Sequence, residues 1–279
     1  MITYIKTLRE WIGKSELSSD LVTPVPIAAL SATLDRHAPK LGDPLPPFWH
    51  WLYFLPIHRR LDQDGHRQRG EFLPPVPLAR RMWAGSRLEF HRPLKVGDRI
   101  FRASVISNVS CKEGRSGPLV FVTIRHQVSN TEGLALSEDQ DLVFRKPPKG
   151  SDPAPAPQTA PTDFQWQHII RPDPIMLFRY SALTFNAHRI HYDRRYAMQV
   201  EGYPGLVVQG PLIATLLLEL LHRNLPKSVV SRFRFRAIRP LFDTADFSVC
   251  GRHVAETRVE LWARDQENFL AMQADATLV

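Results

Sequence analysis

The segment Gly205–His222 has the sequence GLVVQGPLIATLLLELLH, and its second part decides the fold class. From Pro211 to His222, apolar residues occupy nearly every side of the helix that the sequence predicts, so this helix is expected to be buried. Pro211 suits the first helical position and Gly210 suits the cap before it. An antiparallel sheet wrapped around such a helix would cover its surface. The segment therefore predicts an α+β fold with a long helix inside a sheet.

The two halves of the chain repeat one order of elements. Residues 23–27 (TPVPI) match residues 171–175 (RPDPI) at an offset of 148, and each stretch opens a helical pattern. The tripeptide Arg-Pro-Leu occurs at 92–94 and again at 239–241, an offset of 147, each time before a turn and a long apolar strand. Each half then ends in two strands joined by a polar turn. Matching offsets and matching order favour a duplicated unit.

A proline-rich segment separates the two halves. Six of the sixteen residues 146–161 are proline, which disfavours helix and interior strand and favours an extended spacer. We therefore expect one unit at residues 1–145, a linker at 146–161 and a second unit at 162–279. Two such units side by side would merge their sheets and cover exposed edges.

The composition is that of a globular protein, with 43% hydrophobic and 23% charged residues. No run of about 18 apolar residues is present, so no membrane-spanning helix is expected. The first residues, MITYIKTLREWIGKSE, lack the apolar core of a signal peptide. The two cysteines, Cys111 and Cys250, have no companion at zinc spacing, which argues against a disulfide scaffold and a structural zinc site. These features predict a protein of a reducing compartment, the cytoplasm.

The chain carries 36 Lys and Arg against 28 Asp and Glu, a formal net charge of +8. Its arginines are scattered and form no long basic run, so an anionic small molecule fits this charge better than nucleic acid does. One local pattern stands out, in which Phe233 and Phe235 alternate with Arg232, Arg234 and Arg236. This alternation predicts a half-buried strand with a charged outer face.

The stretch Phe178–Ala197, FRYSALTFNAHRIHYDRRYA, is rich in groups that can do chemistry. On a continuous helix, Asn186 and His191 would point about 140° apart. They converge only if the helix ends near Phe185 and the chain turns back. We expect Asn186 to end the helix, because asparagine tolerates the left-handed conformation.

This stretch resembles the MaoC-like hydratase/dehydratase family of hot-dog proteins, whose signature Ser-Gly-Asp-x-Asn-Pro-x-His precedes a later His-Gly pair. Thr184–His191 occupies the signature here, and Gln209-Gly210 occupies the later pair. The chain is most similar to a branch with the pattern SALTFNxHxIHYD, which contains 3-hydroxyacyl-thioester dehydratases and hydratases of C5 dicarboxyl-CoA esters. The likeness extends over the whole chain, including the Trp-rich segment at 48–54. It implies a double hot-dog, each unit a long helix wrapped by an antiparallel sheet, with a degenerate first unit that binds substrate or CoA.

The resemblance also implies roles for individual residues. His191 matches the catalytic histidine, and Gly210 matches the glycine whose amide, or that of Leu212, stabilises an enolate oxygen. Asn186, the third predicted catalytic residue, stands where the wider family has aspartate, and an amide cannot take a proton as a carboxylate does. Either His191 transfers the proton alone, or a carboxylate such as Asp193 helps. The predicted substrate-binding residues are Arg189, His188, Tyr192, Gln209 and Leu212.

The expected activity is that of an enoyl-CoA hydratase acting on itaconyl-CoA, mesaconyl-C4-CoA or both, with citramalyl-CoA as the product. Such a substrate has a free carboxylate, whose burial requires a cation, preferably arginine. Arg189 lies where the wider family commonly has proline, and Arg179 and Arg81 are further candidates. A cation at such a position could instead hold a phosphate of coenzyme A.

Two other functions remain open from the sequence. One is a 3-hydroxyacyl-thioester dehydratase of fatty-acid synthesis, acting on carrier-protein or CoA thioesters. The other is a hot-dog protein that binds acyl thioesters without catalysis, which only Asn186 favours. No metal or nicotinamide cofactor is expected, since the sequence has no Gly-x-Gly-x-x-Gly, Walker or HExxH motif. Coenzyme A enters as part of the substrate, no nucleic-acid or membrane partner is expected, and the resemblance implies a homo-oligomer.

Overall fold

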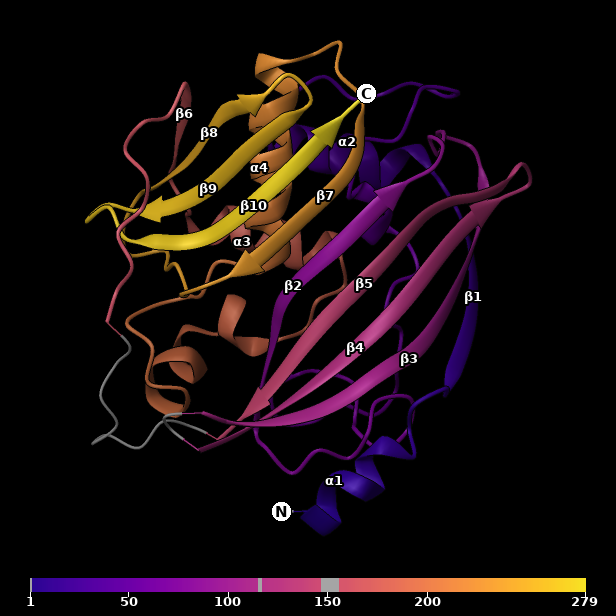
Figure 1. The fold of residues 1–279 in the computed structure, drawn as a ribbon, viewed down its shortest axis with the longest axis vertical. Coiled ribbons are helices and arrows are strands. Elements are labelled where there is room, and N and C mark those ends of the chain that lie inside the picture. The colour runs from indigo at the N-terminus through magenta and orange to yellow at the C-terminus, as the bar shows by residue number, and fades with distance from the viewer. Residues whose placement is uncertain (1, 115–116, 147–155) are drawn as a thin grey trace.

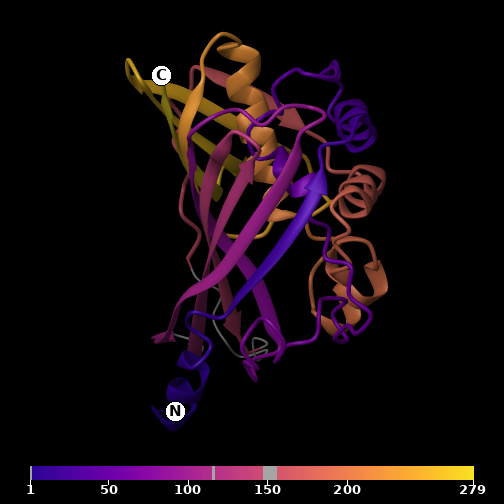
Figure 2. The same ribbon diagram turned by 90° about the vertical axis from the view of Figure 1, so that its right-hand side faces the viewer.

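The strands form one antiparallel sheet, which carries the helices α2, α3 and α4 on one face (Figures 1 and 2). The computed structural model describes residues 2–114, 117–146 and 156–279. The strand order in the sheet is β1-β3-β4-β5-β2-β7-β10-β9-β8-β6. The strands are β1 (Ser15–Leu21), β2 (Arg80–Phe90), β3 (Arg99–Gly114), β4 (Gly117–Asn130), β5 (Gly133–Arg145), β6 (Trp166–Ile170), β7 (Val230–Ala237), β8 (Phe247–Ala255), β9 (Arg258–Asp265) and β10 (Leu270–Leu278). The α-helices are α1 (Ile2–Arg9), α2 (Pro24–Thr33), α3 (Pro174–Leu183) and α4 (Gly210–Asn224).

The sheet is continuous across the two halves of the chain. Strands β1–β5 lie on one side and β6–β10 on the other, and β2 pairs with β7 where they meet. Gly85 sits at this seam, where a Cβ atom would lie 2.3 Å from the carbonyl oxygen of Phe235. Glycine is therefore required for the two strands to approach. The predicted linker falls largely on residues 147–155, which lie outside the described residues.

The backbone supports the predicted duplication. Helices α2 and α3 have ten residues each and begin at Pro24 and Pro174, so their offset is 150 rather than the 148 expected from the proline pattern. The segments that enter the two Arg-Pro-Leu tripeptides also share their hydrogen bonds. His91 and Arg92 donate to the carbonyl of Ala135, and Ile238 and Arg239 donate to the carbonyl of Ala271.

The two halves differ in their central helix. In the second half, α4 follows a backbone hydrogen bond from Val208 to Leu241. The matching bond in the first half, from Leu45 to Leu94, is followed only by the short 3-10 helix η1 (Trp49–Leu52). The long helix expected inside each unit is thus present in the second half, while η1 takes its place in the described part of the first. The physical reason is that the chain leaves the helical path at Phe54, which has a left-handed φ of 55°, and that Pro56 cannot continue a helix.

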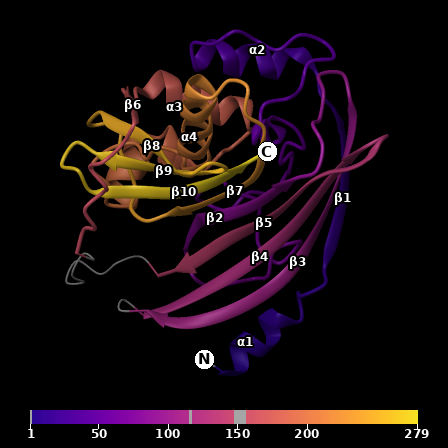
Figure 3. The same cartoon turned by 45° about the horizontal axis from the view of Figure 1, so that its top comes forward.

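The buried helix predicted from Pro211 to His222 is confirmed. In α4 the ten residues 212–221 are all buried, and the helix contacts β6, β8, β9 and β10 of the curved sheet (Figure 3). The predicted half-buried strand is also confirmed, because Phe233 is 1% exposed while the side chain of Arg232 is 70% exposed. In the described residues, no helix has the length and hydrophobicity needed to span a bilayer.

The packing of α4 predicts a large effect for a single truncation. Leu217 is fully buried, so Leu217→Ala should lower the free energy of unfolding by about 2–5 kcal/mol through lost burial and a residual cavity. Leu17 on β1 is 83% exposed, and Leu17→Ala is the matched control, expected within about 0.5 kcal/mol of the parent. Urea denaturation followed by circular dichroism measures both changes. Equal effects at the two positions would contradict the burial of α4.

Candidate active site

The signature residues lie in a loop that begins where α3 ends. Phe185 has a left-handed backbone, with φ of 50°, and the amide of Asn186 donates a 2.8 Å hydrogen bond to the carbonyl of Ser181. This pattern is a common way to end a helix and reverse the chain. The helix thus ends near Phe185 as predicted, but the left-handed residue is Phe185 and not Asn186. The reversed chain forms the 3-10 helix η2 (Arg189–His191), which packs against α3.

His191 is buried and oriented by one hydrogen bond. Its Nδ1 lies 2.7 Å from the carbonyl oxygen of Val207. A carbonyl only accepts, so Nδ1 carries the proton, and Nε2 of the neutral ring keeps a lone pair. No described residue hydrogen-bonds to this Nε2. Burial lowers the pKa of His191 to about 4, against a smaller opposite effect of the Val207 carbonyl. The ring is therefore neutral near pH 7 and can accept a proton at Nε2.

The amino end of α4 lies three residues after Val207 in the sequence. Within the described part of the chain, the backbone amides of Gly210 and Leu212 have no hydrogen-bond acceptor, and Pro211 has no N–H group. Unpaired amides at the positive end of a helix favour an oxyanion. A Cβ atom on Gly210 would meet no atom closer than 4.0 Å, so the fold itself does not require glycine there. The Leu212 side chain is fully buried in the core, which leaves only its amide for a ligand.

Gln209 connects α4 to α3 through its side-chain nitrogen. Its fully buried Nε2 donates hydrogen bonds of 2.9 Å to the carbonyl of Leu177 and to Oγ of Ser181. Ser181 also accepts the amide of Asn186, so one residue of α3 holds both the start of α4 and the start of the signature loop.

Asn186 closes the loop and keeps one free donor. Its Oδ1 accepts the amide of His188 at 3.2 Å, a short-range turn that suits asparagine. Its Nδ2 has no partner among the residues that the structure describes. The catalytic role predicted for Asn186 therefore requires only that Nδ2 donate to a ligand.

Three other signature residues hydrogen-bond within the protein. The guanidinium of Arg189 pairs with Asp193 at 2.8 Å and stacks on the ring of Tyr196. The Tyr196 amide and Arg189 hold the pKa of the Asp193 carboxyl below its ordinary value, so this carboxylate stays ionised at the protein surface. The hydroxyl of Tyr192 donates to the carbonyl of Ala187 at 3.0 Å. Arg189, Tyr192 and Asp193 thus stabilise the loop itself.

A loop from the first half completes the site, and sequence reasoning missed it. Residues 61–67 form a tight turn in which Gly65 has a φ of 92°. A Cβ atom on Gly65 would lie 1.8 Å from the carbonyl oxygen of Ala187, and the amide of Arg189 donates to the carbonyl of Asp64 at 2.9 Å. The turn is therefore packed directly on the signature loop. The only sequence signal was the turn-forming Asp-Gln-Asp-Gly at 62–65.

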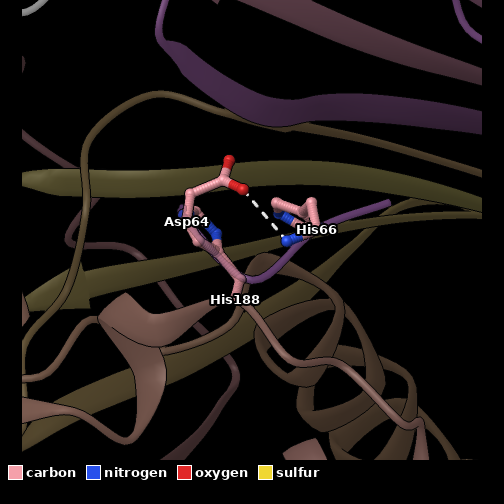
Figure 4. A group of neighbouring side chains, drawn as sticks. All are labelled: Asp64, His66 and His188. Atoms are coloured by element: carbon pink, nitrogen blue, oxygen red, sulfur yellow. Dashed lines mark hydrogen bonds between the residues drawn. The ribbon is translucent and has the colours of Figure 1, made fainter. Parts of the chain in front are cut away.

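This contact brings Asp64 and His66 beside His188 (Figure 4). The rings of His66 and His188 lie 4.3 Å apart, and the His188 ring lies edge-on to His191 at 5.3 Å. Ligand atoms of the group Asp64, His66 and His188 lie within 4.8 Å of one another, a set that could bind a divalent cation. Against this, the charge of the nearby Arg81 acts on both Asp64 and His188. A second cation would be repelled at this position.

The comparisons with known proteins identify the family of the chain. Residues 48–243 match the family model of hydroxyacyl-thioester dehydratase type 2. The chain is 46% identical over 273 residues to mesaconyl-C(4)-CoA hydratase of Chloroflexus aurantiacus, covering 96% of each chain. It is 30% identical to a mitochondrial hydroxyacyl-thioester dehydratase type 2 of Schizosaccharomyces pombe, covering 87% of this chain and 90% of the other. The chain belongs to the hydroxyacyl-thioester dehydratase type 2 family.

Solved structures show the fold of this dehydratase family member. A MaoC-like dehydratase superposes with a TM-score of 0.75 at 15% identity, covering 96% of this chain and 98% of the other. A Mycobacterium tuberculosis protein described as having a double hot-dog fold superposes with a TM-score of 0.60 at 15% identity, covering 96% of each chain. The predicted double hot-dog class is thus confirmed, and the chain is a hydro-lyase that acts on acyl thioesters.

The buried state of His191 predicts the acid limb of the hydro-lyase's pH profile. Because the base must be neutral and burial lowers its pKa to about 4, kcat/KM should stay level from pH 7 to roughly pH 5 and fall toward pH 4. In the unfolded chain His191 has the ordinary pKa of 6.5, so the unfolded state gains a proton first as the pH falls. The free energy of unfolding is therefore highest above pH 6.5 and decreases as the pH falls toward 4. Circular dichroism at each pH separates unfolding from protonation. An acid limb near pH 6.5 in folded protein would contradict the neutral base.

The space around Gly210 allows a test that separates catalysis from folding. Gly210→Ala should leave the thermal midpoint unchanged, since the added Cβ meets no atom closer than 4.0 Å. It should lower kcat/KM by roughly 10-fold or more, because a thioester oxygen must approach the amide closely. Full activity in the variant would show that Gly210 only begins the helix.

Proposed function

We propose that this hydro-lyase adds water to mesaconyl-C4-CoA and forms citramalyl-CoA, with itaconyl-CoA as a second C5 dicarboxyl substrate. The observation that carries the proposal is the 46% identity to a mesaconyl-C(4)-CoA hydratase over 96% of both chains. A further support is the arrangement of His191 and the free amides of Gly210 and Leu212, which meets the needs of hydration.

In the proposed hydration of mesaconyl-C4-CoA, Nε2 of His191 accepts a proton from water while the water oxygen bonds to the β-carbon. Itaconyl-CoA, whose double bond joins the β-carbon to the terminal methylene, first isomerises to mesaconyl-C4-CoA by moving a proton from the α-carbon to that methylene. The electron pair of the double bond moves toward the thioester, and the negative charge that develops on its oxygen is stabilised by the amides of Gly210 and Leu212. The protonated His191 then returns the proton to the α-carbon. Burial lowers the pKa of this imidazolium to about 4, so it is a strong proton donor in the last step.

The amide of Asn186 has a supporting role in this proposal. Its Nδ2 donates a hydrogen bond to the water or to the thioester oxygen, since it has no acceptor among the described residues. No second carboxylate is needed, because His191 both takes the proton and gives it back. The first half of the chain is proposed to bind coenzyme A, since its own central helix is replaced by η1.

The relative in Schizosaccharomyces pombe favours a second candidate, a 3-hydroxyacyl-thioester dehydratase of fatty-acid synthesis. This reaction would use the same residues in the reverse direction. Its acyl chain carries no free carboxylate, so the two candidates differ in their need for a buried cation.

The discriminating experiment offers mesaconyl-C4-CoA, itaconyl-CoA and crotonyl-CoA to the purified protein and follows citramalyl-CoA or 3-hydroxybutyryl-CoA by chromatography. We expect citramalyl-CoA from the dicarboxyl esters and slow hydration of crotonyl-CoA. His191→Ala should lower kcat by roughly 100-fold to 10,000-fold. Fast crotonyl-CoA hydration with inert dicarboxyl esters would establish the fatty-acyl candidate instead.

A further inference from the structure

The proposed substrate requires a cation for its free carboxylate, and the arginines near the signature loop differ in their availability. Arg189, the sequence-based choice, is paired with Asp193 at 2.8 Å. Arg80 is paired with Glu201 at 2.6 Å and stacks on Tyr203. Arg179 lies on the exposed side of α3. These three side chains are therefore committed elsewhere or directed to solvent.

Arg81 is different from these arginines. Its side chain has no hydrogen bond and no ion pair in the part of the chain that the structure describes, although it is half-buried. Asp64 and Asp62 act on it only at longer range, and burial lowers the pKa of its guanidinium despite these charges. A half-buried guanidinium without a contacting anion is unfavourable, so this position favours an anionic ligand.

A small cavity lies beside Arg81. Its volume is about 20 Å³, and Arg81, Asp64, His188 and Ile190 are among its lining residues. On this measure ~10–15 Å³ holds one water, so the cavity has the scale of a carboxylate group and not of an acyl chain. Because β2 pairs with β7 only from Gly85 onward, the stretch around Arg81 is free of β7 and faces the signature loop.

The cavity also lies close to the proposed base. His188 lines the cavity and its ring contacts the ring of His191 at a centroid distance of 5.3 Å. In mesaconyl-C4-CoA, the free carboxylate is attached to the β-carbon, the atom that receives the water. A cation for this carboxylate must therefore lie within a few ångströms of the base, as a residue beside His188 does.

We propose that the guanidinium of Arg81 binds the free carboxylate of the C5 dicarboxyl thioester, an inference that rests on the proposed function. Two parallel N–H···O bonds from a planar guanidinium would also orient the β-carbon toward His191. Arg81 is then the residue that separates dicarboxyl from simple enoyl thioesters.

The test combines two changes, one that removes the charge of the Arg81 side chain and one that removes the charge of the substrate carboxylate. The wild-type protein, Arg81→Gln and Arg81→Lys are each given mesaconyl-C4-CoA and its methyl ester, in which the free carboxylate is neutral. Arg81→Gln should lower kcat/KM for the acid about 100-fold or more and leave the ester within roughly 3-fold. The wild-type protein should prefer the acid by a similar factor, and Arg81→Gln should not discriminate. Arg81→Lys should regain part of the preference.

Arg179→Gln on the exposed side of α3 is the matched control for loss of one positive charge, and it should change neither substrate. Equal losses for acid and ester in a folded Arg81→Gln protein, or an unchanged acid rate, would overturn the assignment while the proposed function stands. If Arg81→Gln does not fold, a wild-type protein that hydrates acid and ester equally well overturns it too. A wild-type protein that hydrates crotonyl-CoA but not mesaconyl-C4-CoA would instead refute the proposed function and the inference together.

Discussion

The hydrogen bond between Nδ1 of His191 and the carbonyl of Val207 joins the signature loop to the segment that leads into α4. It fixes the tautomer of the ring, since the carbonyl leaves the proton on Nδ1 and the lone pair on Nε2. It also brings the proposed base close in space to the free amides, because Val207 precedes Gly210 by only three residues. The burial that protects this bond lowers the pKa of His191. The position and the protonation state of the proposed base thus depend on one contact.

The duplicated architecture explains why the chain has one such site. Both halves keep the first helix, the Arg-Pro-Leu turn and the long strands, with matching backbone hydrogen bonds. Among the residues that the structure describes, only the second half has the long central helix with its unpaired amino end. At the position of Asn186 the first half has Arg36, which forms an ion pair with Glu219 of α4 at 2.7 Å. The first half therefore supports the helix of the second instead of forming a site of its own.

The sequence predicted most of the second half and little of the contact between the halves. The apolar run at 211–222 was sufficient for the buried helix, and the spacing of Asn186 and His191 was sufficient for a chain reversal near Phe185. The prediction that Asn186 adopts the left-handed conformation was wrong. The position of the helix end depends on the hydrogen bond from Asn186 to Ser181 and not on residue preference alone. The packing of Asp64 beside His188 joins residues more than 120 positions apart, and no periodicity or motif in one sequence encodes such a contact. Pro56, only eight residues after Phe48, did carry a signal against a long first central helix.

The turn at Gly65 has a consequence for the history of the chain. In a protein made by joining two equal units, a single unit could at first still fold alone and pair with a second copy of itself. Here the turn of the first half touches the carbonyl of Ala187 so closely that only glycine fits, and the loop that carries His191 is shaped against it. Each half has become part of the folding environment of the other. Removing either half would therefore also remove a surface against which the other half is packed.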